Sequence, residues 1–129
     1  MIDHTGFNVT RLADSKAFYT RVLESLGHVV RLEIADLAVG FGPRQPEEGA
    51  DPGGGFWITL GTPSVPRMHL AFSAKNKDEV DAFHRAALLA GGKDNGAPGY
   101  RPQYHPGYYA AFVFDPDGYN IEAVYHERK

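Results

Sequence analysis

The sequence contains no cysteine among its 129 residues. Disulfide bonds and thiolate metal sites are therefore excluded, and any bound metal ion has to use histidine, aspartate or glutamate as its ligands. The chain also has no run of about 18 apolar residues and no basic, apolar leader at its start. We therefore expect no contact with a membrane and a cytoplasmic location.

The chain also lacks an excess of basic charge, because 13 lysines and arginines are set against 16 acidic residues, for a net charge of −3. Without a basic surface to offset phosphate repulsion, nucleic acid is not an expected partner. Hydrophobic residues make up 43% and charged residues 22%, which is ordinary globular composition. At this length we expect one domain over residues 1–129.

The sequence repeats itself at an offset of 65 residues. The offset aligns identical residues without a gap: His4 with His69, Phe7 with Phe72, Phe18 with Phe83, Leu23 with Leu88 and Gly27 with Gly92. Self-similarity at one fixed offset indicates a repeated structural unit. We therefore divide the chain into module 1 at 1–61 and module 2 at 66–129, joined by a proline-containing linker at 61–66.

Each module is predicted to have the element order βαβββ, which makes the fold class α+β. Alternation of side-chain character predicts first strands at 2–9 and 67–74, and helical periodicity predicts helices at about 12–26 and 78–91. Short strands bounded by turn residues follow each helix. We place these strands near 28–35, 37–42, 55–60, 100–104, 108–114 and 119–126.

Two histidines and one glutamate form a candidate metal site. His4 and His69 occupy equivalent places in the predicted first strands, and Glu122 lies in the last predicted strand. Equivalent positions of two modules related by a pseudo-twofold axis can converge near that axis. Two imidazoles and one carboxylate suit Fe(II) and also serve Mn, Zn, Ni or Co. We predict that these residues hold one divalent ion, the alternative being hydrogen-bonded histidines of the core.

Three segments carry a resemblance to a known family: 3–9, 15–19 and 115–122. Over essentially the whole chain the sequence resembles the vicinal oxygen chelate superfamily of glyoxalases, bleomycin-resistance proteins and extradiol dioxygenases. The resemblance implies a partly open curved sheet around a central cavity. It also implies up to four metal ligands from the first and last strands of both modules, three of which map to His4, His69 and Glu122.

The fourth ligand position falls on Trp57, because 57 lies 65 residues before Glu122. An indole cannot bind a metal ion, so the sequence departs from the four-ligand pattern of glyoxalase I. Extradiol enzymes use an additional histidine, but none lies between His28 and His69. Fosfomycin-modifying enzymes need several basic groups, and only Arg101 and Arg67 are candidates. The substrate and the reaction type stay open.

Residues 100–109 concentrate tyrosines with one arginine and one histidine. This mixture is typical of a pocket wall, although packing on an open sheet face is the alternative. We assign catalytic roles to Glu122, His105 and Tyr104. Arg101, which can clamp a carboxylate, is assigned with Trp57 and Tyr108 to binding the substrate.

Two hypotheses of function follow. The first is a divalent-metal-dependent enzyme whose small substrate chelates the ion through adjacent oxygens, as an isomerase, lyase, dioxygenase or transferase. The second is a metal-free protein that sequesters a small aromatic compound. The resemblance implies a homodimer; if modules are exchanged, His4 comes from one chain and His69 with Glu122 from the other.

Overall fold

The structure is a computed structural model, and it describes residues 1–128. Its elements follow the chain in the order β1 (Thr5–Val9), α1 (Leu12–Glu24), β2 (His28–Ile34), β3 (Ala38–Pro43), β4 (Phe56–Leu60), β5 (His69–Ser73), α2 (Lys77–Leu89), β6 (Lys93–Tyr100), β7 (Tyr108–Phe114) and β8 (Asn120–His126). The α+β class and the two tandem βαβββ modules are therefore confirmed.

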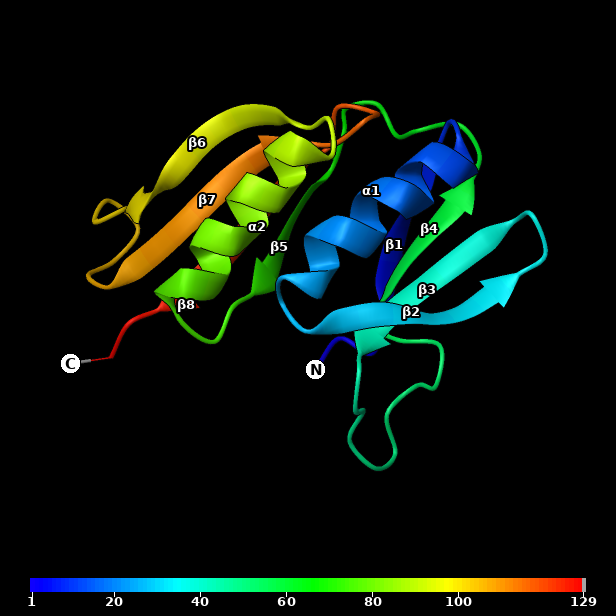
Figure 1. Cartoon of the computed structure of the whole chain (residues 1–129), viewed down its shortest axis with the longest axis horizontal. Helices are drawn as coiled ribbons and strands as arrows, with labels where there is room; N and C mark the ends of the chain where they lie inside the picture. The colour runs from blue at the N-terminus through cyan, green and yellow to red at the C-terminus, as the bar shows by residue number, and fades with distance from the viewer. Residues whose placement is uncertain (129) are drawn as a thin grey trace.

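Each module forms one mixed four-stranded sheet. The strand orders are β1-β4-β3-β2 and β5-β8-β7-β6, and in each sheet the first strand runs parallel to the last strand of its module while the other pairs are antiparallel. Figure 1 shows the two modules side by side, with α1 and α2 next to each other on the same side of the sheets.

The repeat found in the sequence is also a repeat of strand register. Gly6 lies opposite Trp57 in module 1, and Ala71 lies opposite Glu122 in module 2, so both pairs are related by the offset of 65. The bounds of α1 and α2 differ by the same offset. Trp57 and Glu122 are therefore structurally equivalent residues.

A shared hydrophobic core joins the two modules. One cluster of buried side chains includes Phe7, Tyr19 and Ile58 from module 1 and Phe83 and Ile121 from module 2. Burial of apolar surface of this kind is the main favourable contribution to folding. The sheet faces that do not pack against the helices are left to form the candidate site.

Aromatic and polar contacts cross between the modules. The rings of Phe7 and Tyr119 are stacked with centroids 3.7 Å apart, and the Tyr119 hydroxyl donates to the Asn8 carbonyl at 2.6 Å. The Tyr19 hydroxyl donates to the buried Asp115 carboxylate at 2.5 Å. Asp115 begins the tight turn between β7 and β8, so this turn is attached to the helix of the other module.

The predicted position of one strand was wrong. The second strand of module 2 is β6 at Lys93–Tyr100, and the predicted strand at 100–104 is mostly a turn. β6 is an edge strand with irregular pairing around Gly96 and Gly99, and its polar, glycine-rich residues show no alternation. The repeat itself could have located it, since His28 at the start of β2 corresponds to Lys93.

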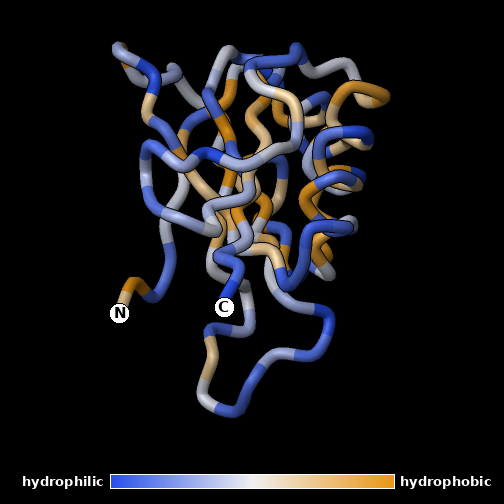
Figure 2. Tube along the Cα trace, turned by 90° about the vertical axis from the view of Figure 1, so that its left-hand side faces the viewer, coloured by the Kyte–Doolittle hydropathy of each residue, from blue (hydrophilic) through white to orange (hydrophobic). Residues whose placement is uncertain are grey.

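The longest connection of module 1 is the loop at 44–55, between β3 and β4. Figure 2 shows this loop extending from the body of the molecule in mostly hydrophilic colours. The corresponding connection in module 2 is only the turn at 115–119. Within residues 1–128, no helix has the length and apolar character needed to cross a membrane.

Candidate functional site

His69 and Glu122 form the centre of the candidate site in module 2. His69 is the first residue of β5, and Glu122 lies in β8, which runs parallel to β5. The His69 Nε2 atom is 2.9 Å from Glu122 Oε1. The Glu122 side chain is only 3% exposed, whereas the His69 side chain is 45% exposed. A buried carboxylate is therefore paired with a partly exposed imidazole.

The second nitrogen of His69 decides what this pair can bind. His69 Nδ1 is 2.7 Å from the backbone carbonyl oxygen of Asn120. Because a carbonyl only accepts, Nδ1 carries a proton, and a neutral imidazole then has a lone pair at Nε2. Two lone pairs at this separation need a cation between them, either a proton or a metal ion. Neighbouring ligands of one metal ion lie about 3 Å apart at ordinary bond lengths.

Tyr108 holds the other oxygen of the Glu122 carboxylate. Its hydroxyl donates a short hydrogen bond to Glu122 Oε2 from the adjacent strand β7. Burial, together with this carboxylate, raises the pKa of Tyr108 well above its usual value. The phenol therefore stays protonated at neutral pH and keeps donating. Tyr108, predicted to bind substrate, lies in the structure beside the predicted metal ligand.

Phe112 and Arg101 extend the same face of the module 2 sheet. Phe112 lies opposite Glu122 in the β7–β8 pair, and its ring stacks on the His69 imidazole with centroids 6.2 Å apart. The Arg101 guanidinium lies 5.4 Å above the Phe112 ring and donates to the carbonyls of Gly99 and Ala97. Arg101 thus places a fixed positive charge on the face that carries the His69–Glu122 pair.

Tyr104 and His105 lie in the turn that follows β6, at the edge of this face. Their rings are 4.9 Å and 5.3 Å from the Tyr108 ring. His105 Nε2 is 3.0 Å from His126 Nδ1, and both Tyr104 and His105 are exposed. The predicted aromatic segment therefore gathers around Tyr108, and neither Tyr104 nor His105 has a polar contact with Glu122 among the hydrogen bonds of the described residues.

His4 does not join His69 and Glu122 within one chain. The expectation that it lies inside the first strand is wrong, because β1 begins at Thr5. Among residues 1–128, the group of possible ligands whose atoms all lie within 4.8 Å of one another is Asp3, His4 and Asp51. The hydrogen bond to Asp3, 2.7 Å long, raises the pKa of His4, and the nearby Asp51 charge adds to this effect.

Trp57 lies on the helix-free face of the module 1 sheet. Its indole N–H donates to the Gly54 carbonyl at 3.1 Å, and its ring lies against Gly53 and Gly40. The indole is therefore occupied with the 44–55 loop of its own chain. Substrate binding by Trp57 stays a prediction.

Two cavities flank these residues. A cavity of about 250 Å³ between the modules is lined by apolar side chains and by none of the three predicted metal ligands: Leu23, Phe41, Phe56, Leu70 and Phe72 are among its walls. A more polar cavity of about 550 Å³ lies beside the 44–55 loop and is lined by both Asp3 and Asp51. The second cavity leads to the carboxylates around His4.

Sequence reasoning missed Asp51 and the role of the Asn120 carbonyl. Asp51 belongs to a proline- and glycine-rich loop without strand or helix periodicity, so nothing in its spacing pointed to His4. The Asn120 contact is made by the backbone, which side-chain patterns do not report. The equivalence of Trp57 and Glu122 was visible in the sequence, but the proximity of Asp51 to His4 was not.

Comparisons with known proteins agree with the repeat and the fold. The family model described as the glyoxalase/bleomycin resistance protein/dioxygenase superfamily matches residues 1–123. A crystal structure of a glyoxalase/bleomycin resistance protein from Albidiferax ferrireducens is similar with 29% identity over 95% of both chains and a TM-score of 0.75. No curated protein gave a significant match.

More distant structures share the fold. A glyoxalase/bleomycin resistance protein/dioxygenase family enzyme from Burkholderia phytofirmans has 18% identity over 98% of both chains and a TM-score of 0.70. A lactoylglutathione lyase from Agrobacterium tumefaciens has 20% identity over 96% of this chain and 92% of its own, with a TM-score of 0.64.

Proposed function

We propose that this chain, which belongs to the glyoxalase/bleomycin resistance protein/dioxygenase superfamily, is a divalent-metal-dependent enzyme. Its substrate would be a small molecule with two adjacent oxygens that chelate the ion. The metal would supply Lewis acidity, which lowers the pKa of a bound substrate oxygen or carbon acid.

The His69–Glu122 pair is the observation that carries this proposal. The His69 Nε2 and Glu122 Oε1 atoms face each other at 2.9 Å, the imidazole is fixed by the Asn120 carbonyl, and the second carboxylate oxygen is held by Tyr108. Metal-binding histidines ordinarily donate their other nitrogen to a carbonyl or carboxylate in this way. The pair therefore fits a divalent ion in its donor atoms and in the bonds that orient them.

The other residues of this face have roles that follow from their positions. Glu122 Oε1 can accept a proton from a substrate bound beside it, while the bond from Tyr108 to Oε2 keeps the carboxylate in place. Arg101 can attract an anionic end of the substrate. Tyr104 and His105 would form the rim, where the exposed imidazole of His105 can exchange protons with solvent.

The third ligand, His4, requires a second protomer in this proposal. His69 and Glu122 are together in one chain, whereas His4 is grouped with Asp3 and Asp51. A homodimer in which module 1 of one protomer faces module 2 of the other would bring the three ligands together. Such an interface is symmetric, so it would form two equivalent sites.

The experiment that tests the proposal is elemental analysis of protein purified without chelator or affinity-tag metal and reconstituted anaerobically. We expect about one equivalent of metal per chain in the unaltered protein and none in His69→Ala or Glu122→Ala. His4→Ala should lose the metal and also the geometry of the site. A mixture of His4→Ala and Glu122→Ala protein should regain metal in about one quarter of its sites if subunits exchange, because mixed dimers contain one intact site.

A failure to bind metal would support the second hypothesis of function. If reconstitution with Fe(II), Mn, Co, Ni and Zn gives no stoichiometric binding, the enzyme proposal is wrong. The metal-free hypothesis would then be tested by binding of small aromatic compounds, followed through Trp57 fluorescence, since this is the chain's single tryptophan.

A further inference from the structure

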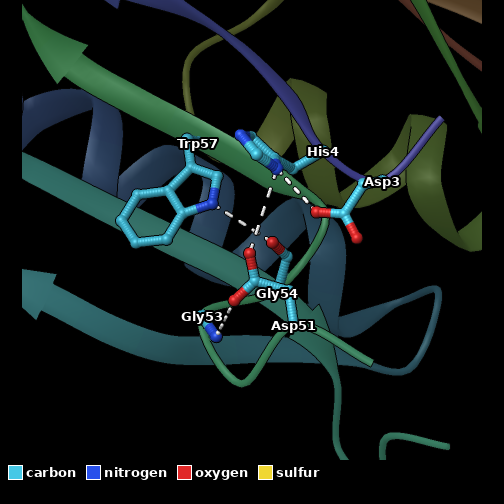
Figure 3. A network of polar contacts seen from close by, with 6 residues as sticks. All are labelled: Asp3, His4, Asp51, Gly53, Gly54 and Trp57. Carbon is cyan, nitrogen blue, oxygen red and sulfur yellow. Dashed lines mark hydrogen bonds and ion pairs between the residues drawn. The ribbon is translucent and has the colours of Figure 1, made fainter. Parts of the chain in front are cut away.

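Position 57 and position 122 are equivalent in the fold but differ in chemistry. In module 2 the carboxylate of Glu122 is adjacent to His69, the counterpart of His4. In module 1 the strand residue is Trp57, yet His4 still has a carboxylate close by that comes from a loop. Asp51 Oδ2 lies 3.9 Å from His4 Nδ1. Figure 3 shows Asp51 and Asp3 approaching the same imidazole nitrogen.

The turn that carries Asp51 leaves one of its oxygens available. Asp51 Oδ1 accepts from the Gly53 amide at 2.8 Å, and the Asp51 backbone carbonyl accepts from the Gly54 amide at 3.0 Å. These bonds fix the side chain with Oδ2 directed toward His4. The side chain is 31% exposed, compared with 71% for Asp3, which lies in the segment before β1. Asp51 is therefore the better fixed of the two carboxylates.

Trp57 holds this turn against the sheet. A Cβ atom on Gly53 would lie 2.4 Å from the Trp57 ring, and one on Gly40 would lie 2.7 Å from it, so only glycine allows the indole to fit between them. Gly54 has a φ of +91° and lies against the Phe41 carbonyl, which again requires glycine. Trp57, which cannot bind a metal ion, thus fixes the position of Asp51, whose carboxylate can.

We propose that Asp51 supplies the carboxylate ligand of module 1 and that Trp57 is its positioning residue. The inference rests on the proposed metal site and adds a ligand to it. Two ligands of one ion are separated by about 3 Å when neighbouring and about 4 Å when opposite, and the 3.9 Å between His4 Nδ1 and Asp51 Oδ2 lies in this range. His4 Nδ1 is also 2.7 Å from Asp3 Oδ1, and in this proposal the ion replaces that hydrogen bond. The complete set is then two imidazoles and two carboxylates, which favours a hard divalent ion such as Mn or Fe(II) over a thiophilic one.

The test is Co(II) binding to the full-length protein, followed by calorimetry and by the visible absorption of the bound ion. In Asp51→Asn the amide oxygen can still accept from Gly53, so the turn is kept while the charged ligand is lost. We expect at least about tenfold weaker binding and an altered Co(II) spectrum. Asp3→Asn is the matched control and should change the affinity by less than about threefold.

Two further results separate this inference from the proposed function. In Trp57→Phe, which keeps a ring but removes the bond to Gly54, affinity should fall by less than in Asp51→Asn and the spectrum should keep its shape. If Asp51→Asn binds Co(II) like the unaltered protein while Glu122→Gln does not bind it, the metal site stands and Asp51 is not a ligand. An effect of Asp3→Asn equal to or larger than that of Asp51→Asn would also overturn the assignment.

Discussion

The helix-free faces of the two modules have the same backbone arrangement but carry chemically different residues at equivalent positions. In module 2 the small Ala71 and the large Phe112 lie on either side of Glu122, and the carboxylate is buried beside His69. In module 1 the residues on either side of Trp57 are Gly6 and Gly40, and the indole ring lies against Gly40. Repeated backbone geometry therefore does not impose repeated chemistry, because the neighbouring side chains decide what fits.

The difference extends to the loops. Module 2 closes β7 and β8 with a tight turn, so its carboxylate has to come from the strand itself. Module 1 connects β3 and β4 through residues 44–55, and the end of that loop is bonded to Trp57. The longer connection allows a carboxylate to reach His4 from outside the sheet. If Asp51 is a ligand, as proposed, one half of the site is built on strands and the other half partly on a loop.

Substituting the two equivalent residues, Trp57 and Glu122, has the largest expected effect. Trp57→Ala should lower the free energy of unfolding by about 3 kcal/mol, because the half-buried ring leaves a gap against glycines that cannot fill it. Glu122→Gln should change this free energy by less than about 1 kcal/mol, since an amide can satisfy both His69 and Tyr108, yet it should abolish metal binding. Urea unfolding and metal titration of both variants check this; equal effects on stability would contradict the comparison.

Tyr108→Phe should have an intermediate effect confined to module 2. Loss of the hydroxyl leaves Glu122 Oε2 without its donor, so we expect metal affinity to fall about tenfold to a hundredfold. The adjacent Tyr109 is the control, because its hydroxyl donates to Asp81 on the opposite face of the sheet. Tyr109→Phe should lower stability by about 1 kcal/mol and leave metal affinity unchanged. Calorimetric titration and urea unfolding distinguish the two variants.

The smallest effect concerns the equivalent residues His28 and Lys93, which begin β2 and β6. Burial lowers the pKa of His28 below 6.5, whereas Lys93 is exposed. Below about pH 6.5 the unfolded state then binds more protons than the folded state, so the free energy of unfolding falls as the pH drops through the lowered pKa. His28→Asn should reduce this loss below about pH 6.5, measured by urea unfolding, and Lys93→Gln should not.

Much of the fold could be predicted because the same pattern of residues occurs twice in the sequence. The offset of 65 identified both first strands, both helices and the equivalence of Trp57 with Glu122. The prediction failed at β6, where an edge strand contains Gly96 and Pro98 and its residues need not alternate. Packing against β7 decides that this segment is a strand, and no local preference reports such packing.

The candidate site could be predicted only in part. The sequence and the resemblance placed His69 and Glu122 in one candidate site, but their direct contact follows from the parallel pairing of β5 with β8, which only the structure shows. The surroundings of His4 depend on how a loop folds back across the sheet. Asp51 reaches His4 because Trp57, Gly53 and Gly40 fit together, and contacts of this kind join residues with no regular spacing.

The sequence by itself determined the repeated βαβββ order, the exclusion of thiolate chemistry and the residue types available for a metal site. Each depends on composition or on a local pattern that is read along the chain. Only the tertiary structure decided that His69 and Glu122 meet within one chain while His4 is paired with Asp3 and Asp51 instead. Long-range packing sets the distances between side chains, and those distances determine which donor atoms can share one ion.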